Sequence, residues 1–95
     1  MGNYEILMME LARTRIPSYM HTGLAHYVSE GRPVGDFLTA VLSNDLKTAC
    51  SHADENNKHV LYDYVHFLYN YAPISCWGSP ERVTDWIQQH RPITI

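Results

Sequence analysis

The feature that most constrains the fold is the segment from Asp54 to Ala72, whose apolar residues recur at helical spacing. At about 100° per residue, these residues gather on one broad face of a helix: Val60, Leu61, Tyr64, Val65, Leu68, Tyr71 and Ala72. The opposite face receives His59, Asp63, His66 and Asn70. Because so wide an apolar face needs cover from several neighbours, we expect a central helix at about 54–72 with the other helices packed around it.

Both ends of this segment carry boundary signals. Asp54 is suited to cap the first turn, because its carboxylate can accept hydrogen bonds from the free backbone amides there. Pro73 cannot continue the helix, because its ring clashes with the preceding turn and it has no N–H to donate. The sequence therefore predicts a helix that begins beside Asp54 and ends before Pro73.

Similar local signals divide the rest of the chain. Gly31 is placed to end a helix as its C′ residue. Ser43-Asn44-Asp45 interrupts an apolar rhythm that runs from Phe37 to Ala53, and these residue types favour caps and turns. We expect a kink or a break there, with Asn44 or Asp45 restarting a short helix. Ser79-Pro80-Glu81 has the order of an N-cap, a first-turn proline and a first-turn acid.

No repeat and no pair of strands joined by a hairpin turn is evident in the sequence. The predicted fold is all-α: a compact bundle of five or six short helices in a single domain, 1–95, with 91–95 as a tail that frays. Trp86 belongs to the last helix and is expected to be buried in the core.

Composition excludes several classes of function. The chain has 7 Lys and Arg against 10 Asp and Glu, a net charge of −3, with no block of like charges. Nucleic acid is therefore not the expected partner, since it requires a basic surface. The apolar run near the N-terminus is short and is interrupted by Glu5 and Glu10, so we expect no membrane span and a cytoplasmic protein.

The residues that could carry chemistry form weak patterns. His59, Asp63 and His66 share a helical face, but two histidines and one carboxylate do not complete a tetrahedral metal site, and no metal or other cofactor is predicted. Cys50 lies on the apolar rhythm of its helix and is expected to be a small buried side chain. Cys76, in a loop beside Trp77, is more suggestive, although no nucleophile signature surrounds it. We therefore predict no catalytic residues.

Aromatic residues crowd the last third of the chain and are its most informative feature. Most of them are expected in the core. Tyr62 and Tyr69, seven residues apart, fall on the flank between the two faces of the central helix, where amphipathic aromatics favour protein interfaces. Tyr62, Tyr69 and Trp77 are therefore the predicted interaction surface, for another protein or for a second copy of the chain.

The segments GDFLTAVLSNDL, FLYNYAP and CWGSPERVTDWI together resemble a group of short proteins from bacterial and phage genomes. The resemblance spans roughly Ile16 to Ile87 and carries neither an assigned activity nor a site that could be transferred. It implies a small non-enzymatic protein, encoded by a phage or mobile element, that modulates a host or phage protein in the host cytoplasm. The alternative hypotheses are a helical nucleic-acid-associated regulator and an enzyme that uses His and Cys.

Overall fold

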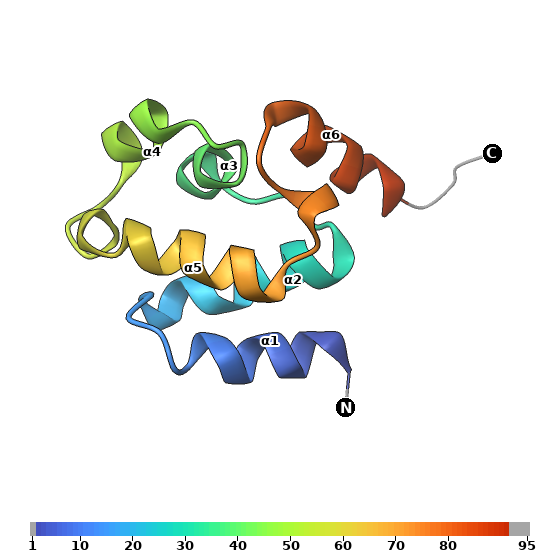
Figure 1. The fold of residues 1–95 in the computed structure, drawn as a ribbon, viewed down its shortest axis with the longest axis horizontal. Helices are drawn as coiled ribbons and strands as arrows, with labels where there is room; N and C mark the ends of the chain where they lie inside the picture. Colours follow the sequence, from blue (N-terminus) through green and yellow to red (C-terminus); the bar gives the residue numbers. More distant parts are fainter. Residues whose placement is uncertain (1, 92–95) are drawn as a thin grey trace.

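The helices pack in two groups (Figure 1). The computed structural model describes residues 2–91, and in that range it contains six α-helices, three 3₁₀ turns and no strand. In the first group, α1 packs against α2 and α5; in the second, α3 packs against α4 and α6. Their bounds are α1 Asn3–Leu11, α2 His21–Glu30, α3 Asp36–Leu42, α4 Leu46–His52, α5 Leu61–Tyr71 and α6 Pro80–Gln89.

One apolar core joins the two groups. Its buried members include Leu7, Leu11, Ile16, Leu24, Ala25, Tyr27, Val28, Leu38, Leu42, Val60, Tyr64, Phe67, Leu68, Cys76 and Val83. The radius of gyration is 12.8 Å, close to the roughly 12 Å of a compact chain of this length. The predicted all-α bundle is confirmed. Residues 92–95 of the predicted tail lie outside the described residues.

The central helix begins later than predicted, at Leu61 instead of beside Asp54. Asn57–His59 form a separate 3₁₀ turn, and Asp54 caps that turn by accepting from the backbone N–H groups of Asn56 at 3.1 Å and Asn57 at 2.7 Å. The buried Asn57 side chain accepts the hydroxyl hydrogen bond of Tyr64, which ties the turn to α5. Asp54 therefore has the predicted capping chemistry, but for a different element.

The buried face of α5 is also rotated relative to the predicted one. Tyr64 and Leu68 are buried as expected, but Phe67 is fully buried as well, whereas Val65 is 51% exposed. Phe67 precedes Leu68, so its burial moves the core face away from Val65 by part of a turn. The large Phe67 ring removes more apolar area from water than Val65 could, which favours this orientation.

The predicted interruption between Phe37 and Ala53 is a complete break. Asn44 adopts a left-handed conformation with φ of 61°, and Asp45 caps α4 by accepting from the backbone N–H of Thr48 at 3.2 Å. Because the break changes the phase of the helix, the apolar rhythm does not continue on one face of α4. The prediction that Cys50 is buried was wrong for this reason: its side chain is exposed.

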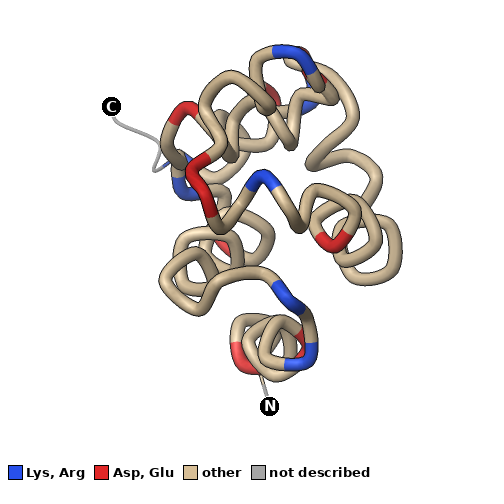
Figure 2. Tube along the Cα trace, turned by 90° about the vertical axis from the view of Figure 1, so that its left-hand side faces the viewer, with Lys and Arg blue, Asp and Glu red and all other residues tan. Residues whose placement is uncertain are grey.

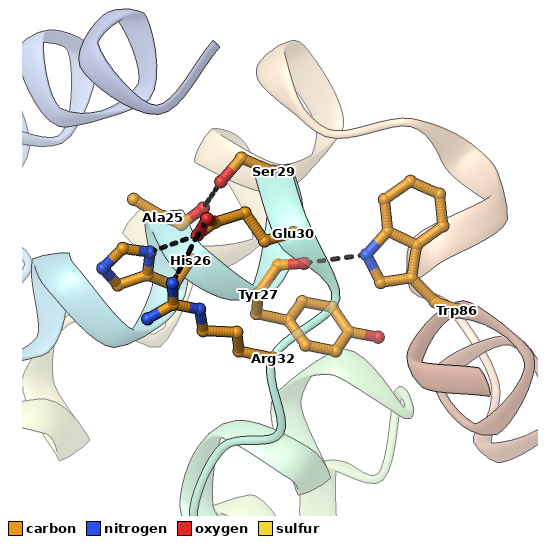
Figure 3. A network of polar contacts seen from close by, with 7 residues as sticks. All are labelled: Ala25, His26, Tyr27, Ser29, Glu30, Arg32 and Trp86. Carbon is orange, nitrogen blue, oxygen red and sulfur yellow. Dashed lines mark hydrogen bonds and ion pairs between the residues drawn. The ribbon is translucent and has the colours of Figure 1, made fainter. Parts of the chain in front are cut away.

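Gly31 closes the C-terminal end of α2. Trp86 of α6 reaches across to this end of the helix (Figure 3). Gly31 has φ of 67°, as expected for a C′ glycine, and its N–H donates to the carbonyl of Tyr27 at 2.9 Å. The indole N–H of Trp86 donates to the same carbonyl at 2.7 Å. Trp86 is therefore only partly buried, contrary to the prediction, because its N–H reaches a helix end at the margin of the core.

A polar cluster on α2 joins it to α1. The imidazole of His26 lies 2.7 Å from the Glu30 carboxylate and stacks on Tyr4 of α1 with ring centroids 4.5 Å apart. Arg32 also pairs with Glu30, at 3.3 Å, as Figure 3 shows. The cluster is a surface extension of the α1–α2 packing, and such exposed pairs contribute little stability individually.

The start of α6 is as predicted. The Ser79 hydroxyl accepts from the backbone N–H of Arg82 at 3.2 Å, Pro80 is the first helical residue and Glu81 lies in the first turn. Val83 of this helix is buried, and Ile87 packs against the core at its edge. The cap therefore fixes the point from which α6 reaches back to α2.

We expect Ser79→Ala to lower the free energy of unfolding by about 1 kcal/mol, because the N–H of Arg82 loses its acceptor. The change should also loosen Trp86, which would appear as altered intrinsic fluorescence in a urea titration. Thr84→Ala, at an exposed position of the same helix, is the control and should have little effect. Equal stability of the two variants would show that the Ser79 cap is unimportant.

Candidate functional site

The outward side of α5 carries two exposed tyrosines with a valine between them. Tyr62 is 72% exposed, Val65 51% and Tyr69 79%. Their spacing of three and four residues places them on one face of the helix, and we call these three residues the α5 aromatic face. The structure thus brings together the two tyrosines singled out in the sequence and adds Val65, which the sequence had assigned to the core.

Trp77, the third residue of the predicted interaction surface, has a different environment. It is partly buried and packs against the core. The neighbouring Gly78 donates its N–H to the carbonyl of Leu42 at 2.7 Å, which fixes this segment to α3. Trp77 consequently offers less side-chain surface to a partner than Tyr62 or Tyr69 does.

A groove of about 450 Å³ runs between the C-terminal part of α1 and α5. Its lining is Glu10, Arg13, Thr14, Arg15, Tyr62, Asp63, His66, Phe67 and Tyr71. Tyr62 belongs both to this groove and to the α5 aromatic face, so the two features form one continuous surface. The ring of Tyr62 stacks on His66 at a centroid distance of 5.8 Å.

Arg15 and Asp63 join the two walls of the groove. The Asp63 carboxylate accepts from the backbone N–H of Arg15 at 3.0 Å and from its guanidinium at 2.8 Å. These hydrogen bonds from Arg15 favour the ionised carboxylate and hold the pKa of Asp63 below its usual value. The pair anchors the segment after α1 onto α5.

A second pair lies on the α1 side, where Arg13 and Glu10 are 3.5 Å apart. In both pairs the acid is on the inside: the side chains of Arg13 and Arg15 are 79% and 72% exposed, whereas those of Glu10 and Asp63 are 20% and 13% exposed. The hydrogen bond between the Tyr71 hydroxyl and the Glu10 carboxylate raises the pKa of Tyr71, because ionising that phenol would lose the bond and place two negative charges together. The rim of the groove is therefore formed mainly by guanidinium groups.

The predicted histidine face does not form a metal centre in the described part of the chain. Asp63 is engaged by Arg15, His66 stacks on Tyr62, and His59 lies in the preceding 3₁₀ turn. Among residues 2–91, no group of three or more His, Cys, Asp or Glu side chains is arranged to hold a metal ion. We therefore assign this face no role in binding a metal ion.

We expect neither EDTA nor zinc to change the melting temperature. A metal that binds only the folded state would stabilise it by mass action, and its removal would lower the transition. Differential scanning fluorimetry with each additive, together with metal analysis of the purified protein, tests this. A stoichiometric metal, or a shift of several degrees with either additive, would contradict the expectation.

The two cysteines occupy opposite environments. Cys50 is exposed on α4, whereas Cys76 is fully buried in the 3₁₀ turn Ile74–Cys76, which packs against α6. Burial raises the pKa of the Cys76 thiol to about 12, so almost no thiolate is present at neutral pH. The suggestion from sequence that Cys76 is the more interesting thiol finds no support in this geometry.

We accordingly expect one thiol per folded chain to react quickly with a disulfide reagent such as DTNB at neutral pH. Cys50 supplies that thiol, and Cys76 should react only as the protein unfolds, because the thiolate is the reacting form and burial suppresses it. In urea both should react. Rapid modification of Cys76 in the native protein, located by mass spectrometry, would show that its cover opens readily.

Comparisons with protein-family models, with curated proteins and with solved structures found no match to this chain. Within residues 2–91, none of the helices combines the length and the apolar content needed to cross a membrane. The candidate site is therefore defined by its own geometry: an exposed aromatic helix face that continues into an arginine-rimmed groove.

Proposed function

We propose that this chain is a small non-enzymatic protein-interaction module that docks through the α5 aromatic face onto another protein or a second copy of itself. The observation that supports it best is the exposure of Tyr62 and Tyr69, which leaves most of both rings in water on one helix face. Tyrosine is enriched among the residues that dominate binding energy, because it buries a large area with few rotatable bonds.

The surroundings of this face support the same function. Leu46 of α4 is 68% exposed, and it lines a small apolar hollow that also involves Leu61 and Val65. Exposed apolar surface of this kind, rimmed by polar side chains, is typical of interaction sites. The resemblance to short bacterial and phage proteins favours a host or phage protein as the target, in the host cytoplasm.

Affinity capture with matched variants tests the proposal. Tyr62→Ala/Tyr69→Ala removes the two rings, and Met9→Ala removes an exposed apolar side chain from α1 as a control. From extracts of cells that naturally produce the protein, wild type and Met9→Ala should retain the same partner, and the double variant should bind it at least about tenfold more weakly.

If the partner is a second copy of the chain, light scattering of the purified protein tests the proposal. The wild type should then have the mass of an oligomer, and the double variant should shift towards the mass of a monomer. The double variant must keep the wild-type melting temperature for either comparison to count. Undiminished binding by the double variant would refute the proposal. The proposal would also be refuted if the wild-type protein stays monomeric and captures only proteins that Met9→Ala and the double variant capture equally well.

A further inference from the structure

The two ion pairs of the groove expose their positive members. Arg13 and Arg15 turn outward, while Glu10 and Asp63 lie beneath them. His66, exposed on the same helix as Asp63, adds an imidazole ring that can hydrogen-bond to a ligand in the groove. Although the groove contains equal numbers of carboxylates and guanidiniums, an approaching molecule meets the guanidiniums first.

These guanidiniums have capacity for a further ligand. Each arginine carries five N–H donors in a planar fork. Arg15 uses one side-chain donor on Asp63, and Arg13 approaches Glu10 only at 3.5 Å. A carboxylate can accept two parallel hydrogen bonds from one guanidinium, and such charge-assisted bonds are about twice as strong as neutral ones.

Aromatic side chains form part of the lining of the groove. Tyr62 and Tyr71 expose their rings there, whereas Phe67 is fully buried, and the volume of about 450 Å³ is large enough for several side chains. A ligand that fits the groove combines carboxylates for the guanidiniums with aliphatic or aromatic side chains for the two tyrosine rings.

We propose that the groove between α1 and α5 binds an acidic, partly apolar peptide segment of the partner protein, with Arg13 and Arg15 holding its carboxylates. The inference rests on the proposed function and specifies the chemistry of the partner. The chain as a whole carries −3, so the attraction is local to the groove and is screened by salt.

An acidic peptide fits this surface better than a nucleic acid does. Figure 2 shows the Lys and Arg positions interspersed with Asp and Glu positions along the described part of the trace, rather than gathered in one run of basic positions. Nucleic-acid binding depends on many phosphate contacts, whereas the groove offers two arginines and one histidine. Two guanidiniums on one rim suit the few carboxylates of a short peptide.

Fluorescence anisotropy with two matched peptides tests this. The probe is a short labelled peptide of Glu, Asp and Leu, and the comparison peptide has Gln and Asn in place of the acids. The acidic peptide should bind at least about tenfold more tightly at low salt, and the difference should largely disappear at about 0.5 M salt. Equal affinity of the two peptides would overturn the proposal.

Three single variants locate the site. Arg13→Gln should weaken binding of the acidic peptide by about tenfold, and His66→Gln should weaken it less. Lys47→Gln removes one positive charge from exposed α4 and is the matched control, with an expected change of less than about twofold. If Lys47→Gln weakens binding as much as Arg13→Gln, the attraction is diffuse and the groove is not the site.

Two further outcomes separate this inference from the function on which it rests. If the protein binds single-stranded oligothymidine more tightly than the acidic peptide, the ligand of the groove is a nucleic acid and the inference is refuted. If neither peptide binds but Tyr62→Ala/Tyr69→Ala still abolishes partner capture, the interaction function stands and the acidic ligand is wrong. If the acidic peptide binds through Arg13 while the tyrosines prove dispensable, the groove stands and the α5 aromatic face does not.

Discussion

Replacing Phe67 by alanine is expected to lower the free energy of unfolding by about 3 to 5 kcal/mol. Phe67 is fully buried and belongs to the core that joins α5 to its neighbours. Its removal costs the transfer energy of the ring and leaves a cavity that a small, close-packed core fills only in part. Urea unfolding followed by circular dichroism measures the loss.

Val65→Ala, two residues earlier on the same helix, is the matched control. Val65 is half exposed, so its truncation should change stability by no more than about 0.5 kcal/mol. The pair tests the orientation of α5 directly, because the helical pattern placed Val65, and not Phe67, on the apolar face. A larger loss from Val65→Ala than from Phe67→Ala would mean that α5 faces the other way.

Leu68→Ala should cost about 2 to 5 kcal/mol. Leu68 lies on the buried face in both the sequence-based prediction and the structure, with none of its surface exposed. His66→Ala, on the exposed side of α5, should stay within about 0.5 kcal/mol. Similar destabilisation by these two substitutions in urea would show that α5 lacks a distinct core face.

Helix boundaries set by local chemistry were predictable from the sequence. Ser79 caps α6, Gly31 ends α2 in a left-handed conformation, and Asp45 caps α4 after the break that follows α3. In each case the decisive partner lies within four residues, so the signal is contained in a short stretch of sequence. Local hydrogen-bonding preference was sufficient there.

Features that depend on contacts beyond one helical turn were not predictable in the same way. The central helix was expected to begin near Asp54, but the buried hydrogen bond between Tyr64 and Asn57 accompanies a separate turn before Leu61. The choice between Phe67 and Val65 for the core depends on which neighbours approach α5. Helical periodicity alone predicts a wide apolar face, and it does not determine which residues of that face are buried by neighbouring helices.

Within the candidate site, too, the part contained in one helix was predictable and the part that joins separate segments was not. Tyr62 and Tyr69 were identifiable from sequence, because both signals lie within one helix. The groove was not, because Arg15 and Asp63 are 48 residues apart and neither belongs to a recognisable motif. The sequence placed Asp63 on one helical face with His59 and His66 without predicting a metal site, and it gave no sign that the carboxylate would pair with Arg15 on another segment.

Site-specific photo-crosslinking tests the central claim, that the α5 aromatic face is where the protein docks. The photoreactive residue benzoylphenylalanine would replace Tyr69 in one variant and Met9, exposed on α1, in another. Irradiation in cells should give a single covalent adduct from position 69 and none from position 9, and adding Tyr62→Ala should reduce that adduct by about tenfold or more. An adduct that forms equally from position 9, that is unaffected by Tyr62→Ala, or that fails to form at position 69 would contradict the account.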